Sequence, residues 1–218
     1  SFVEKNPFQM DIHEAMDRDP ILDFKNYKFR YKKGDRIFEA DDVKIAKGEI
    51  TALIGHNGAG KTTFLNCLCG IRKCKGDLVI NGKPLDWKQR RKRMFMIMQD
   101  VSHQLFTESV VEEVLLGMEE EDRDHALTIL KKLDLSMVEE RHPLSLSGGQ
   151  MQRVAIASAI AGDQDIILLD EPTSGLDYKH MVDIAEILKE LQSMGKTIIV
   201  ATHDGEFIES CCSRKLII

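Results

Sequence analysis

The sequence predicts an α/β fold built on a parallel central sheet, and three observations carry this prediction. Short apolar strand candidates, such as residues 50–54 and 166–169, alternate along the chain with segments of helical periodicity. A glycine-rich loop joins the first of these strands to a helix. Two acidic residues follow the second strand, at the edge where parallel sheets gather their ligand sites.

The bulk composition is that of one globular domain. The chain has 218 residues, of which 43% are hydrophobic and 30% charged, so it can bury a sizeable core. Its net charge of −6 argues against a nucleic-acid partner. Its apolar runs are far shorter than the roughly 18 to 20 residues that span a bilayer, and no secretory signal is visible. The five cysteines match no paired zinc spacing, so we expect reduced, partly buried thiols.

The elements follow one another in a regular order. Residues 1–19 are polar and acid-rich and predict a linker or tail ahead of a domain over residues 20–218. Apolar and polar residues alternate over residues 21–31, which predicts a strand that leads toward the glycine-rich loop. Helical spacing over residues 109–158 predicts a helical subdomain at about residues 100–160. A helix over residues 179–194, ended by Gly195, separates strands at residues 166–169 and 197–200.

The glycine-rich loop has the pattern of a phosphate-binding loop. Its residues match GxxxxGK[ST], follow an apolar strand and open a helix near Lys61. The glycines let backbone N–H groups face phosphates, Lys61 can reach the β- and γ-phosphates, and the Thr62 hydroxyl can bind Mg²⁺. A chance match in a glycine-rich turn is the alternative. The predicted nucleotide-binding residues are Gly55, His56, Asn57, Gly58, Ala59, Gly60, Lys61, Thr62 and Thr63.

The acids after the second strand suit magnesium binding and general-base chemistry. We expect Asp170 to hold Mg²⁺, directly or through water, and Glu171 to polarise an attacking water. The alternative is that both acids only cap the next helix. Since kinases, GTPases and many ATPases share this pair of features, it does not identify a family.

The decisive segment is the run Leu-Ser-Gly-Gly-Gln at residues 146–150. It resembles the signature sequence of ATP-binding cassette (ABC) proteins, and it precedes a helix over residues 152–161, as in that family. Ser147, Gly148, Gly149 and Gln150 would form a second anion site at a helix N-terminus. The resemblance implies that this site binds the ATP of a second ABC ATPase subunit, in a head-to-tail homodimer or heterodimer.

Further motifs of that family occur in the expected order. Tyr31 resembles the aromatic residue that stacks on adenine, although a lone strand aromatic is more often a core residue. Gln99 resembles the glutamine that contacts Mg²⁺ and the attacking water, and His203 resembles the switch histidine of the γ-phosphate. Residues 174–177 resemble the loop that crosses the dimer interface, with a plain capping turn as the alternative. With these, the resemblance assigns catalysis to Glu171, His203, Gln99 and Lys61, and metal binding to Thr62, Gln99 and Asp170.

The resemblance covers residues 21–218 and fixes further expectations. It implies a P-loop NTPase (RecA-like) core, an N-terminal antiparallel β-subdomain and an inserted helical subdomain, with ATP and Mg²⁺ as cofactors. It also implies a transmembrane permease partner, no nucleic acid, and a cytoplasmic location on the inner face of the cell membrane. Phe95 and Met98 depart from the family, which often has Gly and Phe there. The chain ends early for the family, so we expect a final strand to be absent, and its start suggests excision from a longer polypeptide.

Residues 104–107, Gln-Leu-Phe-Thr, resemble the energy-coupling-factor branch, whose ATPases power the uptake of vitamins and transition-metal ions. In that branch the segment forms part of the groove for the transmembrane coupling protein, so we expect Leu105 and Phe106 to be exposed. Burial in the helical subdomain is the alternative. The second candidate function is a non-transport ABC ATPase that acts on ribosomes or DNA. It rests on a basic run formed by Lys88, Arg90, Arg91, Lys92 and Arg93.

Overall fold

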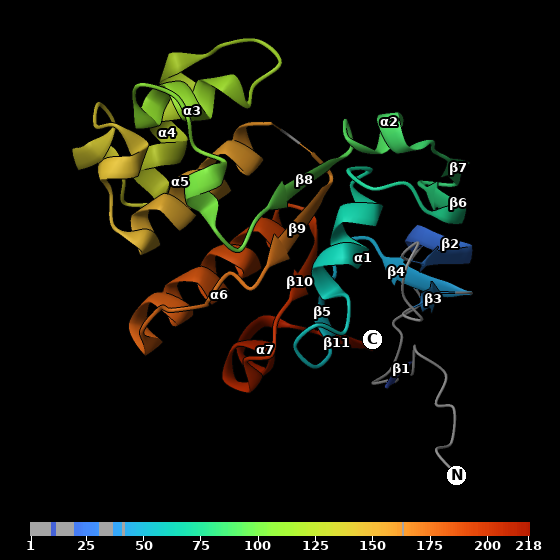
Figure 1. Cartoon of the computed structure of the whole chain (residues 1–218). Helices are drawn as coiled ribbons and strands as arrows, with labels where there is room; N and C mark the ends of the chain where they lie inside the picture. The colour runs from blue at the N-terminus through green and yellow to red at the C-terminus, as the bar shows by residue number, and fades with distance from the viewer. Residues whose placement is uncertain (1–9, 12–19, 31–36, 41, 163) are drawn as a thin grey trace.

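The computed structural model consists of two β-sheets with helices packed around them (Figure 1). It describes residues 10–11, 20–30, 37–40, 42–162 and 164–218. Within these residues, no helix has the length and apolar character needed to cross a membrane.

The central sheet has six strands in the order β1-β11-β5-β10-β9-β8. Its five parallel strands are β5 (Ile50–Ile54), β8 (Met94–Ile97), β9 (Ile166–Asp170), β10 (Thr197–Ala201) and β11 (Arg214–Ile217). The short strand β1 (Met10–Asp11) pairs antiparallel with β11 at one edge. The parallel sheet confirms the predicted fold class. The last of these strands, β11, ends at Ile217, and the expectation of a missing final strand stays a prediction.

The two faces of the central sheet bury different sets of side chains. Every residue of β9 and β10 is buried, as expected for parallel strands covered on both faces. Ile167 and Leu169 pack into a core shared with α5 (Gly148–Ala161), α6 (Tyr178–Ser193) and α7 (Gly205–Cys211). Their neighbours Ile166 and Leu168 face the opposite core, beneath α1 (Lys61–Leu68). The alternation along one strand thus connects the two cores.

The second sheet is antiparallel and packs into the same core as α1. Its strands are β2 (Pro20–Arg30), β3 (Ile37–Ala40), β4 (Val43–Ala46), β6 (Lys75–Ile80) and β7 (Lys83–Pro84). This is the antiparallel β-structure that the family resemblance implied. The short helix α2 (Trp87–Arg90) follows β7. The tail predicted over residues 1–19 lies outside the described residues except for Met10 and Asp11, which form β1.

Residues 101–161 contain the remaining helices, which form a lobe to the left of the sheets in Figure 1. They are α3 (Val110–Leu116), α4 (Arg123–Lys132), α5, and the 3₁₀ turns η1 (Val101–His103), η2 (Ser136–Val138) and η3 (Pro143–Ser145). Ser109 begins α3 with a capping box: its hydroxyl accepts a hydrogen bond from the Glu112 N–H, and the Glu112 carboxylate accepts one from the Ser109 N–H. The subdomain boundaries at about 100 and 160 stay a prediction.

One cysteine pair differs from the expectation of reduced thiols. Cys67 in α1 and Cys74 before β6 form a disulfide, with their Cα atoms 6.0 Å apart. Cys69, Cys211 and Cys212 are free. The spacing of seven residues gives no sign of this pairing, because it requires the chain to turn back sharply after α1.

Candidate nucleotide-binding and catalytic site

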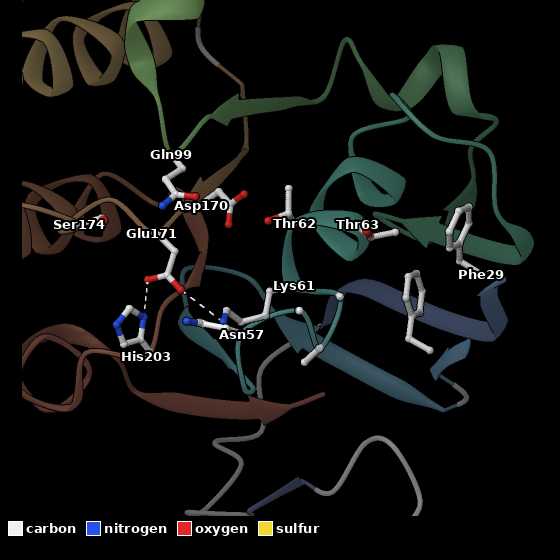
Figure 2. Close-up of a pocket in the computed structure, with 14 residues that line it drawn as sticks. Phe29, Asn57, Lys61, Thr62, Thr63, Gln99, Asp170, Glu171, Ser174 and His203 are labelled. Carbon is white, nitrogen blue, oxygen red and sulfur yellow. Dashed lines mark hydrogen bonds and ion pairs between the residues drawn. The ribbon is translucent and has the colours of Figure 1, made fainter. Parts of the chain in front are cut away.

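A cleft of about 610 Å³ opens where the phosphate loop, the strand-end acids and the antiparallel sheet meet (Figure 2). β5 and β9 deliver the loop and the acids from their carboxyl ends, as the parallel topology requires. The cleft is lined by Phe29, Phe38, Asn57, Gly58, Ala59, Gly60, Lys61, Thr62, Thr63, Gln99, Asp170, Glu171, Ser174 and His203. The structure therefore brings together most of the predicted site residues from four separate parts of the chain.

The phosphate loop is shaped by its glycines. Gly58 and Gly60 have φ values of 78° and 114°, which residues with a side chain rarely adopt. Gly60 precedes the first turn of α1, and no side chain in the described part of the chain caps this helix. The first backbone N–H groups of α1 therefore lie at the cleft without a side-chain partner, at the positive end of the helix dipole. This local arrangement is suited to an anion such as a phosphate. Gly55 and His56, also predicted to bind nucleotide, precede the lining rather than form it.

Lys61 is buried at the base of the phosphate loop, and its side chain joins the end of the loop to its start. Its Nζ donates to the Gly55 carbonyl at 2.9 Å. A Cβ atom at Gly55 would lie 2.8 Å from two atoms of Ile218, so only glycine fits where the end of the chain packs against the loop. Gly55 thus shapes the loop through its carbonyl and its lack of a side chain.

Glu171 lies between two basic side chains at the end of β9. Its Oε1 is 3.3 Å from Lys61 Nζ, and its Oε2 is 2.9 Å from His203 Nδ1 (Figure 2). The backbone of Glu171 has φ 47°, a left-handed conformation that costs free energy in a residue with a side chain. The Glu171 N–H donates to the Ala201 carbonyl at 2.7 Å, which ties this conformation to β10. His203 follows β10, so the sheet positions both side chains of the pair.

Asp170 carries the feature that favours a metal ion. It is buried, and its Oδ1 has no hydrogen-bond partner among the described residues. Burial raises the pKa of the Asp170 carboxyl, while a hydrogen bond from Thr62 lowers it. A buried carboxylate oxygen without a partner is costly unless a cation compensates it. Oxygen ligands from Asp170 and Thr62, which lie near each other in Figure 2, are the type that Mg²⁺ prefers.

Gln99 reaches the cleft from the loop that follows β8 and points toward Asp170 in Figure 2. This loop is held by Gln104. The sequence analysis named Gln104 only as part of the run at residues 104–107 that resembles the energy-coupling-factor branch. Gln104 Nε2 donates to the Met96 carbonyl at 2.6 Å, and its Oε1 accepts from the Met98 N–H at 2.7 Å. The amide clamps the two ends of a turn and so limits where Gln99 can move.

The aromatic end of the cleft contains two rings that the sequence analysis did not single out. Tyr31, the predicted adenine-stacking residue, lies outside the described residues. Among the described residues, Phe29 and Phe38 line the cleft, with their rings stacked at a centroid distance of 6.0 Å. Phe38 is almost fully buried, which leaves Phe29 as the more accessible ring. The alternation in β2 is the signal that could have found Phe29, because it places Phe29 on the same face as Tyr27.

The signature residues lie apart from this cleft. Ser147 begins α5 with a capping box, in which its hydroxyl accepts from the Gln150 N–H and Gln150 Oε1 accepts from the Ser147 N–H. Gly148 is exposed. Among the described residues, none from 146–150 lines the cleft. One copy of the chain therefore presents the phosphate loop and the signature segment at separate places.

The segment at residues 174–177 lies between the cleft and the signature helix. Ser174 lines the cleft, and Asp177 begins α6 by accepting from the His180 N–H at 3.0 Å. This bond and the His180 ring hold the pKa of the Asp177 carboxyl below its usual range. A Cβ atom at Gly149 would lie 3.3 Å from the His180 ring, so α6 packs closely on the start of α5.

The structure separates the two residues that were expected to form an exposed partner surface. Leu105 is 3% exposed and belongs to the core beneath α3 and α5, so the prediction for Leu105 is wrong. Phe106 is 73% exposed, as predicted. The loop that contains them is anchored by the buried Glu113 of α3, whose Oε2 accepts from the Phe106 and Thr107 N–H groups at 3.0 Å and from the Thr107 hydroxyl at 2.8 Å.

Leu105→Ala is expected to destabilise the chain by about 2–5 kcal/mol, because it leaves a cavity in this core. Phe106→Ala removes a solvent-exposed ring and should change stability by less than about 0.5 kcal/mol. Chemical denaturation of the two variants beside the unmodified chain measures the difference. Equal stabilities for the two variants would contradict the assigned burial.

A phosphate loop, a buried acid at a strand end and a carboxylate beside it define a nucleotide-hydrolysing protein of the P-loop class. Residues 38–174 match the sequence profile of the ABC transporter family. The energy-coupling factor transporter ATP-binding protein EcfA of Methanocaldococcus jannaschii is 36% identical over 200 residues, which cover 86% of this chain and 72% of that protein. The chain belongs to the ABC transporter family.

Two further relatives extend the comparison. A Treponema denticola chain, an ABC transporter ATP-binding protein by name, is 50% identical over 172 residues, covering 78% of this chain and 35% of that one. This chain thus spans about a third of that relative's length. The structure of cbiO1 from Clostridium perfringens, described as part of the ABC transporter complex cbiONQ, superposes with a TM-score of 0.78 at 30% identity. That match covers 92% of this chain and 88% of cbiO1.

Proposed function

We propose that this chain is the ATP-binding and ATP-hydrolysing subunit of an ABC importer of the energy-coupling-factor class. The observation that carries the proposal is the position of Glu171, whose carboxylate lies between Lys61 and His203 in a cleft bounded by a phosphate loop. The similarity to EcfA and cbiO1 supports the choice of branch. The transported substrate would bind to another subunit.

In this function seven of the side chains that line the cleft have a chemical task. The N–H groups at the start of α1 and the Lys61 ammonium bind the phosphates of ATP. Glu171 orients the attacking water and accepts its proton, and His203 holds the carboxylate while facing the γ-phosphate. Phe29 offers a ring for the adenine base.

Thr62, Asp170 and Gln99 supply the oxygens that would hold Mg²⁺. When bound, the ion neutralises negative charge on the phosphates. Asp170 is well suited to this, because the unpartnered Oδ1 of its buried side chain needs a cation more than a solvated carboxylate does.

The signature segment makes a second subunit part of the proposal. Ser147, Gly148, Gly149 and Gln150 begin α5 but take no part in their own cleft. In a head-to-tail dimer each such helix start would face the nucleotide bound to the other subunit, whether that is a second copy or a related cassette. We place this dimer on the inner face of the membrane, beneath a transmembrane coupling subunit.

Phe106 provides the test of the membrane partner. The tagged chain, recovered from detergent-solubilised membranes of the cells that produce it, should bring down a transmembrane subunit, and Phe106→Ala should reduce that recovery at least about tenfold. Leu116→Ala is the matched control, because Leu116 is also an exposed large apolar residue of the helical lobe. Recovery with ribosomes, or equal recovery for both variants, would count against the proposed coupling.

A further inference from the structure

The segment from residue 71 to residue 93 differs in charge from the rest of the molecule. It holds nine of the chain's 30 Lys and Arg residues but two of its 36 Asp and Glu residues, a formal charge of +7 in a chain of net charge −6. It comprises the start of the antiparallel hairpin β6–β7 and the helix α2. Such an asymmetry indicates an anionic partner, provided that the charges are exposed and gathered on one face.

Two members of the basic run in this segment have structural roles. Arg90 is 6% exposed and donates to the Tyr27 hydroxyl at 2.9 Å and to the carbonyls of Leu85 and Cys67. The Arg93 guanidinium lies 3.7 Å from the Asp165 carboxylate. The basic run suggested by the sequence is therefore interrupted at Arg90, which is buried, and Arg93 is paired with Asp165, so the run is a weaker argument for nucleic acid than the sequence indicated.

Three of the other cations in this segment gather around one indole ring. The Lys73 ammonium, the Lys88 ammonium and the Arg91 guanidinium lie 5.1, 5.5 and 5.3 Å from the centroid of the Trp87 ring. All three cations are exposed, and within the described ranges no acid forms an ion pair with them. Because all three positive charges lie within 5.5 Å of one ring centroid, an anion bound beside that ring would be stabilised by each of them.

The chain holds this cluster in a fixed place. A Cβ atom at Gly70 would lie 1.9 Å from the Trp87 carbonyl oxygen, so the start of α2 packs directly on the turn after α1. Arg91 Nε donates to the Gly70 carbonyl at 3.2 Å and strengthens this contact. Ile71, beside that turn, is 46% exposed and adds an apolar side chain to the surface. We call Ile71, Lys73, Trp87, Lys88 and Arg91 the indole patch.

We propose that the indole patch binds the anionic headgroups of phospholipids at the membrane surface. The combination of a partly exposed tryptophan, an exposed isoleucine and three exposed cations that form no ion pair with a described acid is suited to the membrane–water interface, where the ring and the aliphatic stems enter the headgroup layer and the charges face phosphates. The proposal rests on the proposed function in one respect, since that function brings the chain to a membrane. A nucleic-acid strand would need basic side chains along several successive phosphates, whereas the indole patch is a single compact cluster.

The chain contains one tryptophan, so its fluorescence reports on this patch alone. Added vesicles of equimolar phosphatidylglycerol and phosphatidylcholine should shift Trp87 emission to the blue and pellet the chain, and both effects should weaken with salt. Vesicles of phosphatidylcholine alone should do neither. Lys73→Glu combined with Lys88→Glu should weaken vesicle binding at least about thirtyfold, at about 1 kcal/mol for each charge near the surface.

The control is Lys131→Glu combined with Lys132→Glu, which makes the same change in net charge on the exposed end of α4 and should leave vesicle binding intact. None of the indole patch residues lines the cleft, so all variants should keep the ATP turnover of the unmodified chain. Binding without a shift in Trp87 emission, or an equal loss in the control, would overturn the proposal. The proposal would also be overturned if glycerol phosphate or a single-stranded oligonucleotide shifted the Trp87 emission and the vesicles did not. ATP turnover and recovery of the membrane subunit test the proposed function separately.

Discussion

Glu171→Gln is expected to lower ATP turnover by about 10²–10⁴-fold while ATP binding is retained. The Gln amide keeps the size of the side chain and can still hydrogen-bond Lys61, but it cannot accept a proton from water. Phosphate release at saturating ATP measures turnover, and equilibrium dialysis measures binding. Because ATP would bind without being hydrolysed, the variant should also accumulate as a dimer, which light scattering detects.

The matched control is Glu209→Gln, which makes the same chemical change at an exposed position of α7. It should leave turnover unchanged. Lys61→Ala offers a second contrast, because loss of the buried ammonium should weaken ATP binding itself. Turnover of Glu171→Gln equal to that of the unmodified chain would show that another group activates the water.

A mixture of two inactive variants is expected to recover activity. Lys61→Ala damages the phosphate loop, and Ser147→Arg blocks the start of α5, which lies apart from that loop within one copy. In a head-to-tail mixed dimer both defects fall on one site, and the other site keeps an intact loop and an intact signature. An equimolar mixture should therefore regain about a quarter of the unmodified turnover, since half the dimers are mixed and each has one working site.

This recovery should rise with protein concentration, because the mixed dimer must form first. The control mixture combines Lys61→Ala with Glu171→Gln, two changes that damage the same cleft. Each mixed dimer then has both of its sites impaired and should stay inactive. Full activity of Ser147→Arg alone, or turnover per chain that is independent of concentration, would contradict a shared site.

The sequence by itself determined the features that depend on neighbouring residues. The phosphate loop, the acids at the end of β9 and the start of α5 were each predicted from one short run, because glycine conformations, strand burial and helix capping are local properties. The order of these runs predicted the parallel sheet, and the parallel sheet predicted that Lys61 and Glu171 meet at one edge.

Only the tertiary structure decided which side chains are buried and which distant ones pair. Leu105 and Phe106 are adjacent and similarly apolar, yet one enters the core and the other stays in solvent, because Glu113 fixes the backbone of Phe106 and Thr107. The sequence predicts Arg90 as one more charged residue of the surface, but in the folded chain Arg90 is buried and donates a hydrogen bond to Tyr27 of β2. The contact between Glu171 and His203 joins residues 32 positions apart through two neighbouring strands. Each of these outcomes depends on elements that meet only after the chain has folded, and no local pattern encodes such a meeting.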